Sequence, residues 1–227
     1  MSVLFARMGS MAEVVVSKLF PAGAGWQASS ILADQLGHAA DTATFAAITG
    51  VGEGLTVFAG HTTYNLVKKI VKPEVSLASE VGVATWLGSA ATCSGASWQP
   101  IVNVLQASGM PFEVVFAGTW LGCGTVFLAG LRVGRVLMPW MPSPDNGNFS
   151  SDAFLSMAIG GATAFFVGTD VAYLNGTGNF LRPIVGVENL DSDLIACIKA
   201  GSSTALGFTV AQTAQNLTFP ANTAWCD

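Results

Sequence analysis

Five long apolar stretches, separated by short polar connections, constrain this chain more than any other feature of its sequence. Each is close to the ~20 residues that an α-helix, rising about 1.5 Å per residue, needs to cross the hydrocarbon core of a bilayer. The stretches are Thr44–Val67, Val81–Leu105, Val114–Leu137, Ala153–Leu174 and Leu194–Leu217. In hydrocarbon, backbone polar groups must find partners within their own segment, so each stretch is expected to be helical. The sequence therefore predicts an all-α, polytopic membrane protein with about five transmembrane helices.

The composition agrees with a membrane protein and argues against several ligands. Hydrophobic residues make up 51% of the 227 residues and charged residues only 10%, whereas soluble domains carry about 25% charged residues. Nine Lys and Arg residues oppose fourteen Asp and Glu residues, and this acidic balance predicts no nucleic-acid partner. Four cysteines lack metal-ligand spacing, so no metal or other cofactor is expected. Bound structural lipids, in contrast, are expected.

The chain divides into three expected parts. Residues 1–40 form an N-terminal arm without the long apolar region of a secretory signal. We expect an amphipathic helix on the membrane surface, outside the bilayer core, followed by a Gly-rich turn at residues 22–25. The alternative is a retained organelle-targeting segment. Residues 41–218 form the transmembrane bundle, and residues 219–227 form a C-terminal tail.

Two pairs of stretches match each other at constant offsets, which predicts an internal repeat. The matches include Gln99 with Gln212, Asn103 with Asn216, Gly52 with Gly161, and His61 with Asp170. The amide matches are the most informative, because amides are uncommon in membrane spans. A single central helix between the two pairs would invert the second pair. Such inverted repeats occur in transporters and wherever a membrane hairpin has duplicated.

Ionisable side chains within the stretches are the first candidate site. Charged groups cost a few kcal/mol at the bilayer centre (roughly 2.5–3.5 kcal/mol for Asp), so they are functional candidates by default. Glu53 lies in the middle of its stretch, and His61 follows a little over two helical turns later, so both can face one direction. Asp170 aligns with His61. The three residues predict either a proton or ion path or hydrogen bonds between helices, and we favour the latter because only Glu53 is a deep carboxylate.

The amide side chains are the second candidate site. Gln99 and Asn103 are four residues apart and therefore share one helix face. Gln212 and Asn216 repeat this pattern in the fifth stretch. The two polar faces could line a pore or could hold each other across the repeat. Because membrane hydrogen bonds average only about 0.6 kcal/mol, we favour the second interpretation.

Glycines on nearly every stretch predict close helix packing, since small residues let membrane helices approach each other. The predicted packing positions are Gly88, Gly122, Gly161 and Gly201. No phosphate-binding loop, nucleophile elbow or acid pair at hydrolase spacing is found, so no enzymatic activity is expected.

These features predict a non-catalytic accessory subunit that packs with other membrane subunits and lipids in a larger complex. An organellar inner membrane, mitochondrial or thylakoid, is the expected location, and the plasma membrane is the alternative. The alternative function is a small oligomeric channel or a proton- or ion-coupled transporter built on the inverted repeat. The nearly even distribution of basic residues leaves the orientation open.

Overall fold

The computed structural model describes residues 12–73, 76–137 and 140, together with scattered residues between 193 and 209. Within these ranges every regular element is a helix, which confirms the all-α prediction. The elements are η1 (Val15–Leu19), α2 (Phe20–Gln35), α3 (Ala43–Val71), α4 (Leu77–Ala107) and α5 (Phe112–Leu137). The first three apolar stretches lie within α3, α4 and α5. The fourth stretch and most of the fifth lie outside the described residues.

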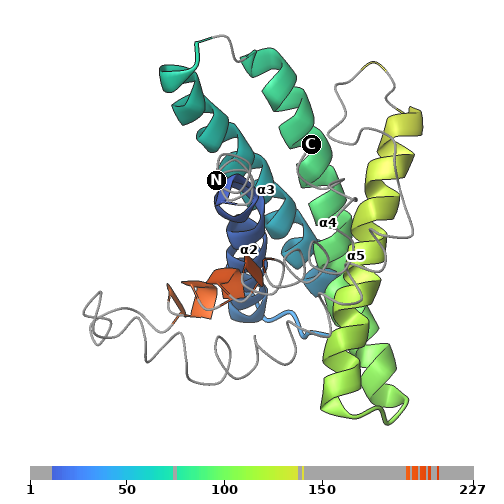
Figure 1. The fold of residues 1–227 in the computed structure, drawn as a ribbon. Coiled ribbons are helices and arrows are strands. Elements are labelled where there is room, and N and C mark those ends of the chain that lie inside the picture. The colour runs from blue at the N-terminus through green and yellow to red at the C-terminus, as the bar shows by residue number, and fades with distance from the viewer. Residues whose placement is uncertain are drawn as a thin grey trace.

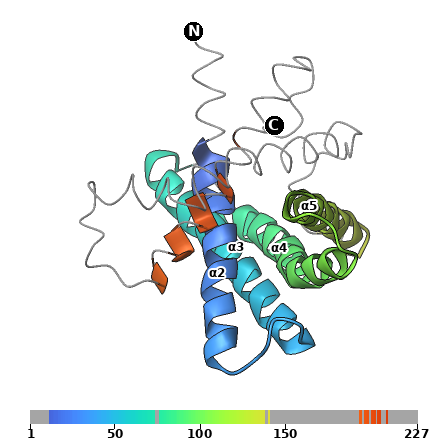
Figure 2. The same ribbon diagram turned by 90° about the horizontal axis from the view of Figure 1, so that it is seen from below.

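Helices α2 to α5 run alternately up and down, and each packs on the one before it in the chain (Figure 1). Seen from below, they lie side by side in chain order, with α3 and α4 in the middle (Figure 2). Among the described residues, α3 alone is long and apolar enough to cross a membrane. That α4 and α5 also cross, and that there are five spans, stays a prediction.

Tight turns set this antiparallel order. Gly37 (φ 80°) follows α2 and Gly109 (φ 69°) follows α4. After α2, the His38 N–H donates to the Ala33 carbonyl at 2.9 Å, and after α4, the Met110 N–H donates to the Leu105 carbonyl at 3.3 Å. This is the Schellman arrangement, whose positive φ glycine adopts without strain. The next helix, α3, begins at a capping residue, because the Thr42 side chain accepts a hydrogen bond from the Phe45 N–H at 3.1 Å.

The predicted Gly-rich turn at residues 22–25 is wrong, because residues 12–35 are continuously helical. Pro21 has no N–H, and its ring would clash with the carbonyl of residue 17 in a regular helix. The π-helix η1 relieves this clash, since the Phe20 N–H donates to the more distant Val15 carbonyl. Packing then overrides the turn preference of the glycines: Gly25 lies directly against the side chain of Thr56 on α3.

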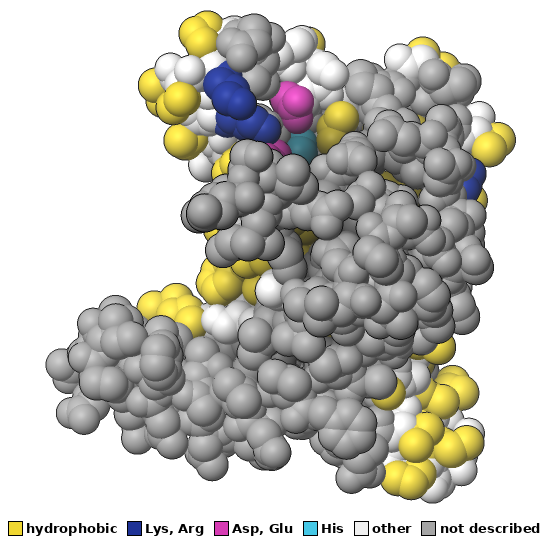
Figure 3. Space-filling model, viewed as in Figure 1, with side chains coloured by type: hydrophobic (Ala, Val, Ile, Leu, Met, Phe, Trp, Pro, Cys, Tyr) yellow, Lys and Arg dark blue, Asp and Glu magenta, His cyan; other side chains and the backbone are white. Residues whose placement is uncertain are grey.

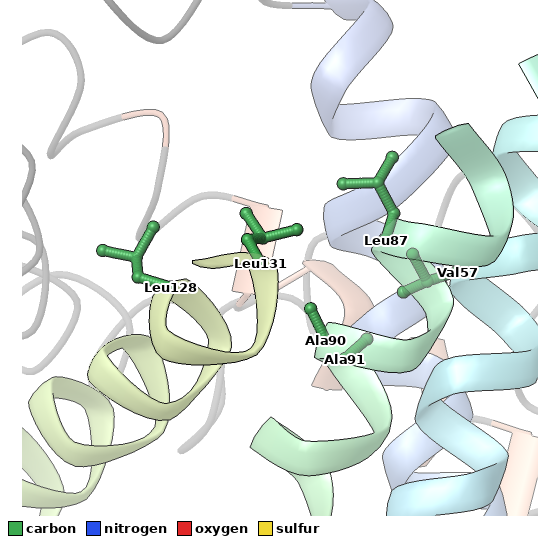
Figure 4. Packing of buried hydrophobic residues seen from close by; sticks show 6 residues of the cluster. All are labelled: Val57, Leu87, Ala90, Ala91, Leu128 and Leu131. Atoms are coloured by element: carbon green, nitrogen blue, oxygen red, sulfur yellow. The ribbon is translucent and has the colours of Figure 1, made fainter. Parts of the chain in front are cut away.

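A buried cluster of aliphatic side chains joins the three long helices (Figure 4). Its members are Val57 of α3, Leu87, Ala90 and Ala91 of α4, and Leu128 and Leu131 of α5. Several of these residues are small, so α3 and α4 come into backbone contact beside the cluster. We call this contact the α3–α4 seam and define it by Gly50, Gly54, Gly88, Thr92 and Gly95.

Candidate functional site

Polar side chains gather where the N-terminal helix, the end of α3 and the start of α4 meet. We call this group the polar cluster; it consists of Glu13, His61, Tyr64, Asn65, Lys68 and Glu80. In Figure 3, lysine, acidic and histidine side chains lie together at this end of the molecule. The cluster links the N-terminal helix, α3 and α4 through polar contacts.

The inner half of the polar cluster is centred on His61, which is only 4% exposed. Its Nε2 lies 3.1 Å from Glu80 Oε2 and 3.1 Å from Asn65 Nδ2. One ring nitrogen cannot donate to a carboxylate and accept from an amide at the same time. With Glu80 ionised, Nε2 therefore carries the proton, and Asn65 is held by its 3.0 Å bond to the His61 carbonyl. The other ring nitrogen, Nδ1, is buried and has no hydrogen-bond partner within the described part of the chain.

The outer half of the polar cluster ties residue 13 to the last turns of α3. The Lys68 ammonium donates to both Glu13 oxygens, at 3.2 and 3.1 Å. Tyr64 donates to the same carboxylate at 3.5 Å, and the ammonium lies 5.7 Å from the Tyr64 ring centroid. Both side chains of the ion pair are about 30% exposed, and such pairs contribute at most about 1 kcal/mol. This half therefore sets how the N-terminal helix is aligned along α3 more than it adds to the free energy of unfolding.

Glu53 lies at a different place, against the α3–α4 seam. A side chain added at Gly95 would come within 2.5 Å of Glu53 Oε2, so the carboxylate rests directly on the α4 backbone. On the same turn of α4, the Trp26 indole donates to the Gly95 carbonyl at 3.2 Å. Glu53 and His61 are about 12 Å apart along the helix axis, and they contact different parts of α4. The structure therefore does not join these two predicted residues into one path.

The amide pair of α4 is satisfied within its own helix. Gln99 Nε2 donates to Asn103 Oδ1 at 2.9 Å, as their spacing on one helix face allows. Their expected counterparts in the repeat, Gln212 and Asn216, lie outside the described residues, and so does Asp170. Whether the two amide faces meet stays a prediction.

The glycines predicted for packing lie at helix contacts of different kinds. A Cβ at Gly88 would lie 2.9 Å from the Gly54 carbonyl oxygen, and one at Gly201 would lie 2.8 Å from the Phe20 carbonyl oxygen. At Gly122 the nearest atom is the end of the Ile101 side chain, at 2.7 Å. Gly161 lies outside the described residues.

Sequence reasoning missed the partners of His61. Asn65 could have been found, because it follows His61 by one helical turn and an amide is uncommon in an apolar helix. Glu80 could not, because its approach depends on how α3 and α4 are aligned. The described residues contain no group of three or more His, Cys, Asp or Glu that could hold a metal ion.

No protein-family model, curated protein or solved structure matches this chain.

Proposed function

We propose that this chain is a non-catalytic, multi-pass membrane subunit that packs with other subunits and lipids in a larger assembly. An organellar energy-converting membrane is the proposed location. The observation that carries the proposal is the outward surface of α3. Only 28% of its most apolar 18-residue segment is buried inside the protein. An equally apolar helix in a soluble protein would be mostly buried.

The outward residues of α3 are large and aliphatic. Leu55 is 61% exposed and Ile70 is 82% exposed. Further exposed apolar side chains on the same helix are Val51, Leu66, Val67 and Val71. Water disfavours such a surface by about 25 cal/mol per Å² of apolar area. Acyl chains or apolar helices of neighbouring subunits would cover it without that cost.

The contacts of the predicted polar residues favour a packing role over transport. Glu53 rests on the backbone of α4, and Gln99 bonds to Asn103 of its own helix. Neither arrangement presents a continuous row of polar groups along the bundle. The bond between Gln99 and Asn103 is instead the local satisfaction of polar groups that hydrocarbon requires.

The alternative, a proton- or ion-coupled transporter or channel, is favoured by one observation. His61 Nδ1 is buried without a partner in the described residues, and a buried polar atom of this kind calls for a water or another ligand. Such a transporter would use His61 and Glu80, rather than Glu53, to carry a proton.

The experiment is purification of the full chain from its native membrane in mild detergent, after extraction with alkaline carbonate. We expect the chain to resist extraction and to migrate on a native gel in a complex with other membrane subunits. Release into the soluble fraction would exclude the membrane assignment. A chain that stays in the membrane as a homo-oligomer, and that supports a specific flux in vesicles, would make the transporter the better assignment.

A further inference from the structure

We infer that residues 12–35 lie within the bilayer as a transmembrane helix paired with α3, with their outer face in contact with lipid acyl chains. This inference rests on the proposed function, because it takes α3 to cross the membrane. It adds one crossing to those predicted from the sequence and moves the N-terminal arm from the membrane surface into the core.

The first argument is that contacts fix the helix along α3 over most of the length of a span. At one end Glu13 pairs with Lys68 at 3.1 Å. In the middle, the Thr56 hydroxyl donates to the Pro21 carbonyl at 2.8 Å. At the other end, Ser29 lies against Gly52. From residue 52 to residue 68 the α3 axis rises about 24 Å, compared with a hydrocarbon core of about 30 Å.

These contacts recur at every fourth residue on both helices. The contacting positions are Glu13, Ser17, Pro21, Gly25 and Ser29 on one helix and Gly52, Thr56, Gly60, Tyr64 and Lys68 on the other. A Cβ at Gly60 would lie 2.7 Å from the Ser17 carbonyl oxygen, so the backbones touch there as well. Small residues in such a row are the usual means by which membrane helices associate. A helix held this way cannot lie at a depth different from that of α3.

The second argument is the chemistry of the exposed side, which lies about 100° around the helix from the contact positions. The outer face consists of Val16, Phe20, Ala28 and Leu32, which are the exposed positions between residues 13 and 33 and are all apolar. Val16 is 62% exposed and Leu32 is 50% exposed. A helix lying on a membrane surface turns a polar face to water. The exposed side chains of this helix are apolar over that length, with Phe20 lying beside Gly201, and such a face fits acyl chains.

The third argument is that charges lie toward the ends and that Ser29 and Ser30 bond within the helix. Glu13, Lys18 and Asp34 are the charged residues of this segment, and none lies between residues 19 and 33. Ser29 donates to the Gly25 carbonyl at 2.7 Å, and Ser30 donates to the Gln27 carbonyl at 2.8 Å. Such local bonds are what hydrocarbon demands of serine.

The depth of the helix can be measured with spin labels. Single cysteines are introduced into a cysteine-free chain at Ala28 on the outer face, at Leu55 on α3, and at Asp41 in the exposed turn between the two helices. In liposomes, labels at Ala28→Cys and Leu55→Cys should both be accessible to oxygen and shielded from a water-soluble nickel complex. The label at Asp41→Cys should show the opposite behaviour. Circular dichroism of each variant verifies that the fold is kept.

The outcomes separate this inference from the proposed function. A label at Ala28 that is accessible to nickel, with Leu55 still in lipid, would overturn the inference and leave the membrane assignment standing. Nickel access at both positions would overturn both.

Sidedness supplies a second test. If residues 12–35 cross with α3, an impermeant maleimide should label Ala12→Cys and Lys72→Cys from the same side of sealed vesicles, and Asp41→Cys from the other side. A surface helix would instead place Ala12 and Asp41 on one side, and that result would overturn the inference.

Discussion

The two interfaces between the three longest helices, α3 with α4 and α4 with α5, differ in the atoms that meet at most of their glycines. In the α3–α4 seam, backbone meets backbone: a Cβ at Gly50 would lie 2.5 Å from the Thr92 carbonyl oxygen, and one at Gly88 would lie 2.9 Å from that of Gly54. Between α4 and α5, a Cβ at Gly130 would lie 3.2 Å from the Ala90 Cα, but side-chain ends fill the space beside Gly118 and Gly122. The nearest atoms are Cδ1 of Leu105 at Gly118, 2.9 Å away, and Cδ1 of Ile101 at Gly122, 2.7 Å away.

This difference has a mechanical consequence. The end of a leucine or isoleucine side chain can move to another rotamer, whereas a backbone carbonyl can move only if the whole helix shifts. Within a bilayer, close backbone contact is also a main source of attraction, because acyl chains are as apolar as the side chains they would replace. We therefore expect the α3–α4 seam to tolerate substitution poorly and the α4–α5 interface to tolerate it well at Gly118 and Gly122.

The largest expected effect is that of Gly88→Leu. The new side chain would meet the Gly54 carbonyl and the Phe58 Cβ, at 2.9 and 3.1 Å from its own Cβ. Overpacking costs about 1–3 kcal/mol where side chains can adjust, and more where helices must separate. We expect loss of the assembled complex on a native gel and a clear fall in the thermal unfolding temperature in detergent.

The matched control for this prediction is Ser89→Leu, at the neighbouring exposed position of the same helix. It adds a leucine to α4 without entering the seam. If both variants assemble equally well, backbone contact is not what holds α3 to α4.

The next effect concerns the polar end of the same two helices. Glu80→Ala removes the carboxylate 3.1 Å from His61 Nε2, and His61 itself stays buried. An unpaired buried polar group costs about 1–3 kcal/mol. We expect the unfolding free energy in denaturant to fall by an amount in this range, and Glu80→Gln to recover part of it because the amide oxygen still accepts a hydrogen bond.

Glu13→Ala offers a comparison for that loss. It breaks the partly exposed pair with Lys68, for which we expect a loss of at most about 1 kcal/mol in unfolding free energy. An equal or larger loss for Glu13→Ala would mean that the outer half of the polar cluster, not the His61 pair, stabilises this end.

A smaller loss of unfolding free energy, about 1 kcal/mol, is expected for Gly122→Leu, because the Ile101 side chain can adopt another rotamer. The double variant Gly122→Leu with Ile101→Ala exchanges the volumes across the α4–α5 interface and should regain most of the stability. Thermal unfolding of the two variants measures this coupling. A Gly122→Leu loss as severe as that of Gly88→Leu, with no recovery in the double variant, would abolish the distinction between the two interfaces.

The helices of this bundle could be predicted because hydrophobic run length depends on sequence alone. The stretch Thr44–Val67 lies within α3, and the stretches for α4 and α5 fall similarly inside the observed bounds. The bond between Gln99 and Asn103 follows from their spacing. In both cases the information is local, within one helix.

The remaining features depend on how helices align, which local sequence does not state. Glu80 reaches His61 only because the α3–α4 hairpin places the first turn of α4 beside the last turns of α3. Residues 22–25 favour a turn by local preference, since glycine is a poor helix former. They are helical because small residues there allow close contact with α3, an advantage visible only when both helices are in place.

The smallest expected effect comes from Glu53, the carboxylate at the α3–α4 seam. Glu53→Gln keeps the volume of the side chain where it rests against Gly95. No hydrogen bond or ion pair from another described residue reaches this carboxylate, so the substitution removes no partner, and an amide is less costly to bury than a charge. If the chain is an assembly subunit, complex yield on a native gel and ion flux in reconstituted vesicles should both stay unchanged. Gly95→Leu, which would force a side chain against the same carboxylate and the Gly50 backbone, should disrupt assembly in the same experiment. Loss of a specific flux in Glu53→Gln, with the complex intact, would show that the seam holds a working ion path and would make the channel the better proposal.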